Sequence, residues 1–459
     1  MKYLYRTVEG LTINSLKKKD LLTLGFMMFS IYFGAGNLIF PPALGQAAGD
    51  HTLHAMLGFM TTGIGLPLLG ITAIALAGGE YVPLLHAKTW PRFATVLLVI
   101  LYLIIGPLFA MPRTGAVSFE IGIRPFLSAD NLALGQIIYT AVFFASSYYL
   151  ALNPNKIIDR VGRMLTPALL IVLLILFVQA FHAPLGAILP ATGAYINAPF
   201  AQGFQDGYQT MDLLASIAIG ALVANAVRMR GITDSRAVGA ACLVSGLITV
   251  MLMAAVYGSL AYIGATSTSV LGQAENGGQI LSAAVGIFFG SAGNLLLAVI
   301  IGLACLTTCC GITSSAAMFF NKLLKGRISY ERLLLFSILF SFAASNVGLT
   351  QIIALAIPFL VTIYPLIIVF VILSLFDRFI GWRKSIYQGA MALTLVFSFI
   401  DGLHAAGLSS EPVHALLVAY IPFYNIMMGW VCPAVIGALV GLAVSFFQTA
   451  PAAAKESQV

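Results

Sequence analysis

Long apolar runs, separated by short polar or turn-forming segments, dominate this 459-residue chain. A helix needs about 20 apolar residues to cross a bilayer, and twelve runs come close to that length. They lie at 21–47, 53–78, 93–120, 133–152, 165–182, 197–226, 237–264, 292–320, 333–347, 350–376, 386–402 and 422–447. The pattern predicts an all-α integral membrane protein with about twelve transmembrane helices.

Composition supports a lipid environment. Hydrophobic residues make up 60% of the chain and charged residues only 8%, whereas soluble domains carry about 25% charged residues. A chain this apolar cannot cover its surface with polar groups, so the lipid bilayer is its expected surrounding. All five cysteines lie in apolar runs, which argues against a disulfide framework.

Positive charges are concentrated in alternate loops between the predicted spans. Lysine and arginine gather in every second loop, and outside those loops and the tails only Arg113 and Arg124 break the pattern. The loop residues are Lys88, Arg92, Lys156, Arg160, Arg163, Arg228, Arg230, Arg236, Lys322, Lys325, Arg327, Arg332, Arg378, Arg383 and Lys384. This bias places both termini in the cytoplasm. Anionic lipid explains the net charge of +7, so no nucleic-acid partner is expected.

Two of the predicted spans are interrupted. Residues 33–42 read Phe-Gly-Ala-Gly-Asn-Leu-Ile-Phe-Pro-Pro, and residues 203–212 read Gly-Phe-Gln-Asp-Gly-Tyr-Gln-Thr-Met-Asp. Broken backbone at membrane depth is tolerated only where it is buried in protein or lines a cavity. Pro41 and Pro42 are expected in the first turn of the resumed helix, where proline is tolerated. A simple kink without a ligand is the competing interpretation, and the second break weakens it.

The two breaks lie five spans apart, so their helices start on opposite sides of the membrane. Paired breaks in inverted halves mark the binding site of many secondary transporters. We therefore expect a 5+5 inverted repeat with two added helices. The predicted parts are a cytoplasmic tail at 1–19, a first repeat at 20–182, a second at 183–376, and the last two helices with a cytoplasmic tail at 377–459. Loops are expected at 183–198, 265–291 and 403–421, with a surface helix in the last.

Three segments together resemble one known family. These are residues 33–42, the sequence Gly-Pro-Leu-Phe-Ala-Met-Pro-Arg-Thr at 106–114, and Gly-Tyr-Gln-Thr-Met-Asp at 207–212. They are similar to the branched-chain amino acid:cation symporter (LIVCS) family, within the amino acid–polyamine–cation superfamily. The resemblance covers essentially the whole chain. It implies the leucine-transporter fold, with discontinuous helices 1 and 6, and uptake of leucine, isoleucine and valine with a cation, usually Na⁺.

The same resemblance implies a substrate site at the two breaks. Gly34-Ala35-Gly36-Asn37 is similar to the Gly-x-Gly-Asn pattern of distant sodium-coupled leucine transporters, whose amides hold the substrate carboxylate. Thr210 resembles their site threonine, and its neighbours are expected to frame the amine and side chain. The implied substrate-binding residues are Phe33, Gly34, Ala35, Gly36, Asn37, Tyr208, Gln209, Thr210 and Met211.

A cation site is implied in the same way. Residues 311–315 read Gly-Ile-Thr-Ser-Ser and resemble the Gly-Leu-Thr-Ser-Ser pattern of those transporters. The implied Na⁺ ligands are the carbonyls of Ser30, Phe33 and Cys310 and the hydroxyls of Thr313 and Ser314. Hard cations favour oxygen ligands of this kind. Ordinary packing of small residues is the alternative for the two hydroxyls. Beyond the ion, no cofactor is expected.

This sequence also departs from the distant transporters. The run at 237–264 has no asparagine for a second sodium ion, so a single coupled cation is favoured. No arginine stands in the first span, and Arg113 is a candidate outer gate that would pair with Glu120, Asp206 or Asp212; a fixed structural salt bridge is the equal alternative. Asp212 is expected to accept the substrate amine, to stabilise the break or to carry a proton.

We expect a cation-coupled importer of branched-chain amino acids in a bacterial cytoplasmic membrane. Another neutral amino acid, or protons as the driver, is the alternative on the same fold. A membrane-embedded enzyme is disfavoured, because the sequence shows no paired intramembrane acids and no nucleophile–base pair at a recognisable spacing. The preference among leucine, isoleucine and valine, the choice between Na⁺ and H⁺, and the oligomeric state stay open.

Overall fold

The computed structural model of the chain describes residues 18–447, except 80, 153, 233, 378–380, 382 and 410, and excepting the side chains of 154–166, 411 and 413. Most of the predicted tail at 1–19 and residues 448–459 therefore lie outside the described residues. Arg378 does too, and the side chains of Lys156, Arg160 and Arg163 are likewise not described.

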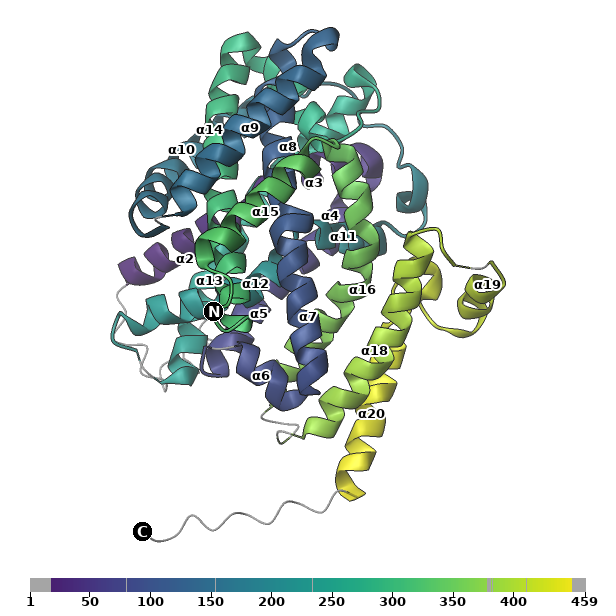
Figure 1. Ribbon diagram of the computed structural model, residues 1–459. Helices are drawn as coiled ribbons and strands as arrows, with labels where there is room; N and C mark the ends of the chain where they lie inside the picture. The colour runs from purple at the N-terminus through teal and green to yellow at the C-terminus, as the bar shows by residue number, and fades with distance from the viewer. Residues whose placement is uncertain are drawn as a thin grey trace.

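The described residues form α-helices joined by short 3-10 and π-helical turns, with no strand among them (Figure 1). The α-helices are α2 (Lys18–Tyr32), α3 (Ala35–Ala48), α4 (Thr52–Met60), α5 (Leu66–Leu76), α6 (Tyr81–Lys88), α7 (Pro91–Leu103), α8 (Ala110–Gly122), α9 (Leu132–Ala151), α10 (Pro154–His182), α11 (Pro199–Asp206), α12 (Asp212–Arg228), α13 (Ser235–Leu271), α14 (Gly277–Leu323), α15 (Tyr330–Ser345), α16 (Leu349–Leu375), α18 (Lys384–Ala405), α19 (Glu411–Tyr420) and α20 (Val431–Phe447). The short turns are η2 (Gly49–His51), η3 (Thr61–Gly65), η4 (Ile104–Leu108), η5 (Arg124–Phe126), η6 (Ala129–Asn131), η7 (Gly193–Ile196), η8 (Gly207–Thr210) and η9 (Tyr424–Ile426).

Every predicted apolar run coincides with helical structure, which confirms the all-α membrane class. By length and composition, the described residues contain seven helices able to cross a bilayer, or eight if the bent pair α11 and α12 counts as one span. The remaining runs form shorter or interrupted helices, so the number twelve stays a prediction. The division into two repeats and a C-terminal part also stays a prediction.

Both predicted interruptions are present. The first separates α2 from α3 at Phe33 and Gly34, and Gly34 has an extended backbone (φ −127°, ψ −167°). The second separates α11 from α12, which are bent by 47° across η8. Met211 occupies the left-handed region there (φ 61°, ψ 13°), a conformation that costs a residue with a side chain roughly 1–2 kcal/mol. The second break is therefore held open against local backbone preference.

Two expectations about these segments are wrong. Pro41 and Pro42 lie inside α3, beyond its first turn, because Gly34 rather than the prolines ends the preceding helix. The loop expected at 265–291 is largely helical. α13 continues to Leu271, and α14 begins at Gly277, where the Asn276 side chain accepts hydrogen bonds from the amides of Gly278 and Gln279. α14 then kinks at Gly290 (φ 65°).

A third break lies inside the predicted span at 93–120. The span formed by α7 and α8 is interrupted by the π-helical turn η4, where Gly106 has a non-helical backbone (φ −98°, ψ −126°). Gly106 and Pro107 explain the break, since glycine tolerates unusual dihedrals and proline lacks an amide donor. As a result, Arg113 lies near the start of a new helix, with its amide bonded to the Phe109 carbonyl.

The half-helices that carry the breaks pack backbone to backbone. A Cβ atom on Gly264 of α13 would lie 2.0 Å from the Pro42 carbonyl oxygen, and one on Gly45 of α3 would lie 1.9 Å from that of Ala261. A Cβ on Gly203 of α11 would lie 1.9 Å from the Ala55 carbonyl oxygen in α4. Small residues allow membrane helices to approach this closely. Thus α3 and α11, each one half of a broken span, are packed closely against α13 and α4.

A buried ion pair fixes the short helix α6 beneath the bundle. The Lys88 ammonium donates hydrogen bonds of 2.8 Å to both carboxylate oxygens of Asp377, which follows α16, and lies 5.0 Å from the centre of the Tyr387 ring. Burial lowers the pKa of Lys88, and the Asp377 carboxylate opposes that effect. The pair connects α6 to the end of α16.

The last helices form a peripheral pair. α18 packs against α16 and α20, and α19 lies to the side of this pair (Figure 1). α19 is the helix that the sequence predicted in the loop at 403–421.

Replacing Gly264 by alanine should destabilise the protein, because the new methyl group must force α3 away from α13. Overpacking of this kind costs roughly 1–3 kcal/mol. The measurement is the apparent Tm of the purified protein in detergent. Gly258→Ala on the same helix is the matched control, because a Cβ there meets no atom within 4 Å. Equal melting of the two variants would contradict the close packing of α3 on α13.

Candidate functional site

The two predicted breaks meet at Asn37. Its side-chain amide donates a 3.1 Å hydrogen bond to the Tyr32 carbonyl, at the end of α2, and a 2.9 Å bond to Asp212 Oδ2, at the start of α12. Asn37 is 1% exposed and Asp212 4% exposed. One side chain therefore joins both broken spans in the interior of the bundle.

Asp212 lies in a ring of neutral donors. Its carboxylate also accepts a 3.4 Å hydrogen bond from the Tyr257 hydroxyl of α13, and its amide donates to Thr210 Oγ1 at 3.3 Å. No lysine or arginine forms an ion pair with Asp212 in the described part of the chain. A buried carboxylate without a cation at contact distance is costly, so this position suits a positively charged group from outside the chain.

Arg113 reaches the same junction from α8. Its Nη1 donates a 2.6 Å hydrogen bond to the Gln209 carbonyl, and its Nη2 makes a long 3.5 Å contact with the Thr210 carbonyl. The guanidinium lies over the Phe40 ring, 5.2 Å from its centre. Arg113 is only 4% exposed. It thus satisfies carbonyls that the second break removes from helical pairing.

The residues expected at the substrate site all lie in this buried region. Ala35 and Gly36 open α3, and no side chain caps the amides of its first turn. Tyr208 stacks on Tyr364 of α16 with ring centres 4.4 Å apart. The Gln209 side-chain oxygen has no hydrogen-bond partner among the described residues. The junction therefore offers free amide donors on one side and a free acceptor on the other.

Three of the expected cation ligands, Cys310, Thr313 and Ser314, lie on α14, and their side-chain hydrogen bonds lie within α14 or join it to α8, α9 and α15. Thr313 donates to the Cys309 carbonyl at 2.6 Å and to Met111 Sδ of α8 at 3.4 Å. Ser314 accepts a 3.2 Å bond from the Tyr330 hydroxyl of α15, and Cys310 Sγ contacts the Ser147 carbonyl of α9.

A different threonine of α14 lies against the first break. A Cβ built on Gly34 would be 3.3 Å from Thr308 Cγ2 and 3.6 Å from its Oγ1. No sequence pattern marks Thr308, because its position beside Gly34 depends on the rotation of α14 relative to α2.

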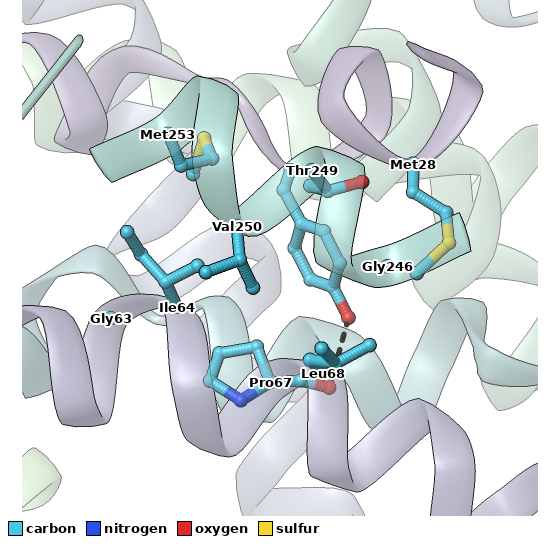
Figure 2. A pocket seen from close by; sticks show the side chains of 10 residues that line it. Met28, Gly63, Ile64, Pro67, Leu68, Gly246, Thr249, Val250 and Met253 are labelled. Atoms are coloured by element: carbon cyan, nitrogen blue, oxygen red, sulfur yellow. Dashed lines mark hydrogen bonds between the residues drawn. The ribbon is translucent and has the colours of Figure 1, made fainter. Parts of the chain in front are cut away.

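A small, narrow cavity lies between α2, η3, α5 and α13 (Figure 2). It is lined mainly by apolar side chains, including Met28, Ile64 and Met253, and the Tyr32 hydroxyl bonds to the Pro67 carbonyl at 3.3 Å. None of the expected substrate residues lines it. In this conformation the residues at the junction are packed against one another.

The C-terminal end of α8 carries a separate polar cluster. Glu120 Oε1 accepts hydrogen bonds from Arg124 at 2.7 Å, Gln279 at 2.9 Å and Asn276 at 3.2 Å. A Cβ on Gly277 would lie 1.7 Å from the Ile39 carbonyl oxygen. The start of α14 is therefore seated directly on α3, and the cluster ties it to α8.

This cluster bears on the expected role of Arg113 as an outer gate. Glu120 is bonded to Arg124, and Asp206 is bonded to Tyr195 and Gln202. In the described residues Arg113 forms no ion pair with either of them or with Asp212. The structure instead brings Arg113 to the carbonyls of the second break. Tyr257 and Thr308 are further residues of the junction that sequence reasoning missed.

These features define a class of protein. An all-helical membrane bundle with two discontinuous helices that meet at a buried polar junction is a multi-pass membrane transporter. A family model described as branched-chain amino acid transport protein matches residues 17–448. The chain belongs to this family, whose members are transport proteins rather than enzymes.

Relatives align with nearly the whole chain. The branched-chain amino acid permease BraB of Bacillus subtilis is 46% identical, covering 95% of this chain and 97% of its own. The branched-chain amino acid transport system 2 carrier protein of Pseudomonas aeruginosa is 44% identical, covering 91% and 94%. The permease BrnQ of Escherichia coli K12 is 39% identical, covering 92% and 95%.

Solved structures with little sequence similarity share the fold. Mhp1, a nucleobase-cation-symport-1 family transporter in a closed conformation with bromovinylhydantoin bound, matches with a TM-score of 0.56 at 14% identity, covering 93% of this chain and 92% of its own. MhsT in complex with L-phenylalanine matches with a TM-score of 0.55 at 16% identity, covering 94% and 98%. This likeness confirms the leucine-transporter-like fold and concerns the fold alone.

Replacing Asn37 by alanine should destabilise the junction, because the Tyr32 carbonyl and the Asp212 carboxylate would each lose a buried donor. A buried acceptor left without a partner costs about 1–3 kcal/mol. The apparent Tm in detergent should fall clearly below that of Asn131→Ala, which removes an exposed side chain bonded to Ser128. A melting temperature equal to that of the control would show that Asn37 does not hold the breaks together.

Proposed function

We propose that the protein imports leucine, isoleucine and valine together with a coupled cation, with Na⁺ as the favoured ion. The observation that carries the proposal is the junction of the two breaks, where unpaired polar groups lie buried in an apolar bundle. The relatives are named as branched-chain amino acid carriers or permeases, and these names support branched-chain amino acids as the substrate class.

The junction suits a zwitterion with an aliphatic side chain. The uncapped first turn of α3 presents amide donors and the positive end of a helix dipole, which attract a carboxylate. The free Gln209 oxygen and the Asp212 carboxylate are acceptors for an ammonium group. Phe33 and Met211 are buried beside these groups and offer the apolar surface that a branched side chain needs.

The coupled cation is proposed to bind between α2 and α14. The ligand set taken from the family resemblance is Ser30, Phe33, Cys310, Thr313 and Ser314. A hydroxyl that donates its proton to the preceding turn, as Thr313 does, keeps lone pairs for a cation. Binding there would organise the break at Gly34 and so raise substrate affinity, and the substrate would raise cation affinity by the same factor.

Protons are the second candidate for the coupled ion, and the position of Asp212 favours this alternative. This carboxylate touches both broken spans through Asn37 and has no cationic partner at contact distance among the described residues. Protonation would change its interaction with Asn37 and Tyr257 at the centre of the junction. A proton taken up at this position would therefore act on the same element as the proposed Na⁺ ion.

We further propose a bacterial cytoplasmic membrane as the location, with both termini in the cytoplasm. The lysine and arginine residues concentrated in alternate loops support this orientation. The relatives named above come from bacteria.

Purified protein in proteoliposomes should accumulate labelled leucine above equilibrium when an inward Na⁺ gradient is applied. Replacing Na⁺ with choline should abolish accumulation, because the gradient supplies the work. Empty liposomes are the control, and unlabelled isoleucine and valine should compete while lysine should not.

If leucine accumulates with choline under a pH gradient, and the Asp212→Asn variant loses this accumulation, protons rather than Na⁺ would be the coupled ion. Absence of accumulation under either gradient would contradict transport of leucine.

The cation site can be tested by two threonine variants on one helix. If the ligand set from the family resemblance is correct, Thr313→Ala should raise the Na⁺ concentration for half-maximal uptake by about tenfold or more. A ligand that contributes about 1.4 kcal/mol of binding free energy changes the affinity by this factor when it is lost. Thr308→Ala should then change it little. The reverse result would assign the cation to the side of α14 that lies against Gly34. Full Na⁺-stimulated uptake in both variants would exclude a hydroxyl ligand from these positions.

A further inference from the structure

Arg113 is a buried cation that forms no contact ion pair among the described residues, although the charge of Asp212 acts on it from farther away. It is 4% exposed, and none of the ion pairs in the described residues includes it. Its two hydrogen-bond contacts, with the Gln209 and Thr210 carbonyls, are both to neutral groups. Removing a guanidinium from water in this way costs several kcal/mol unless a partner compensates it.

One edge of the guanidinium is unused. The Nε–H group has no hydrogen-bond partner among the described residues. The neighbouring Nη2 makes only the 3.5 Å contact with Thr210, whereas Nη1 is engaged at 2.6 Å with Gln209. The Nε–Nη2 edge presents two parallel N–H groups. This fork matches the two oxygens of a carboxylate.

The unused edge belongs to a guanidinium that lies against the start of α3. A Cβ added to Gly36 would be 3.0 Å from Arg113 Nη2 and 3.3 Å from its Cζ. The amides of Ala35 and Gly36 are in the first turn of α3, where helical partners are missing. Amide donors, a helix dipole and a guanidinium therefore converge on one small region. Each of these groups favours an anion.

The internal acids do not supply that anion. Asp212 is held by Asn37 and Tyr257, Glu120 by Arg124 and two amide side chains, and Asp206 by Tyr195 and Gln202. Each carboxylate has its own donors. Asp212 attracts Arg113 only from beyond contact distance, so the Nε–Nη2 edge is left for an anionic group that enters from outside.

We propose that Arg113 binds the carboxylate of the transported amino acid through its Nε–Nη2 edge, opposite the amides of Ala35 and Gly36. This inference rests on the proposed function and deepens it, because it assigns the recognition of the carboxylate to a side chain of α8. The ammonium group then lies toward Gln209 and Asp212.

The arrangement also explains how the substrate acts on both breaks. Arg113 holds the second break through the Gln209 carbonyl, and the carboxylate would lie between Arg113 and the first break at Gly36. An amino acid would thereby connect α3, α8 and η8 in one charge-assisted network. A ligand without a carboxylate could not make this connection.

Three probes separate the carboxylate from the rest of the ligand. Leucine has both charged groups, leucinamide lacks the carboxylate, and 4-methylpentanoate lacks the amine. Their affinities would be measured by competition with labelled leucine, or by ligand-induced thermal stabilisation, on full-length protein in detergent.

Arg113→Gln should weaken leucine and 4-methylpentanoate by about 10- to 100-fold, the usual effect of losing a charge-assisted hydrogen bond. Its affinity for leucinamide should change far less, so the preference for leucine over leucinamide should disappear. Arg113→Lys, which keeps the charge but loses the fork, should retain part of that preference. Arg92→Gln is the matched control, because this arginine lies exposed at the start of α7, and it should bind all three probes as the unaltered protein does.

Equal weakening of leucine and leucinamide in a folded Arg113→Gln protein would assign Arg113 a structural role and overturn the proposal. An unchanged preference for leucine would overturn it as well. If Arg113→Gln does not fold, the same comparison is made with Arg113→Lys, and an undiminished preference there excludes the bidentate contact. Failure of the unaltered protein to bind leucine would count against the proposed function itself.

Discussion

The structure depends on satisfying backbone groups at two helix breaks in an interior that excludes water. Each break removes amides and carbonyls from helical pairing, and an unpaired group in the bilayer interior costs several kcal/mol. Asn37 donates to the Tyr32 carbonyl and Arg113 to the Gln209 carbonyl, so side chains replace part of the lost pairing. No side chain caps the first turn of α3, and the proposed substrate site uses the amides of Ala35 and Gly36 there.

Close backbone packing seats both halves of the first broken span on α13. Glycines 45 and 264 bring α3 directly against α13, and Gly277 seats the start of α14 on α3. On the other side of the break, a Cβ on Gly25 of α2 would lie 2.8 Å from the Ser245 carbonyl oxygen, and Thr249 donates a 2.9 Å hydrogen bond to the Gly25 carbonyl. The unwound residues Phe33 and Gly34 are therefore held between two half-helices that rest on the same neighbour.

Particular residues show which parts of the fold and the candidate site could be predicted from the sequence. The glycines and polar residues at 33–37 and 203–212 predicted both breaks, because glycine tolerates non-helical dihedrals and several polar residues together are unusual in an apolar span. Arg113 stood out as an intramembrane charge, yet its partners were expected to be carboxylates and are carbonyls. Pro41 and Pro42 were predicted in the first turn of the resumed helix but lie beyond it. Glycine and proline both interrupt helices and stand close together here, and Gly34 is the residue at the break. Tyr257 and Thr308 carried no signal, since a tyrosine or threonine in a membrane helix is ordinary.

The sequence by itself determined the membrane class, the helical fold, the two breaks and the residue types at them, because apolar run length and backbone chemistry are local properties. Only the tertiary structure decided which groups meet: Asn37 with Asp212, Arg113 with the Gln209 carbonyl, and Thr308 with the backbone at Gly34. These contacts depend on the rotation and depth of each helix, which packing against several neighbours sets at once. No local pattern in a single helix encodes that choice.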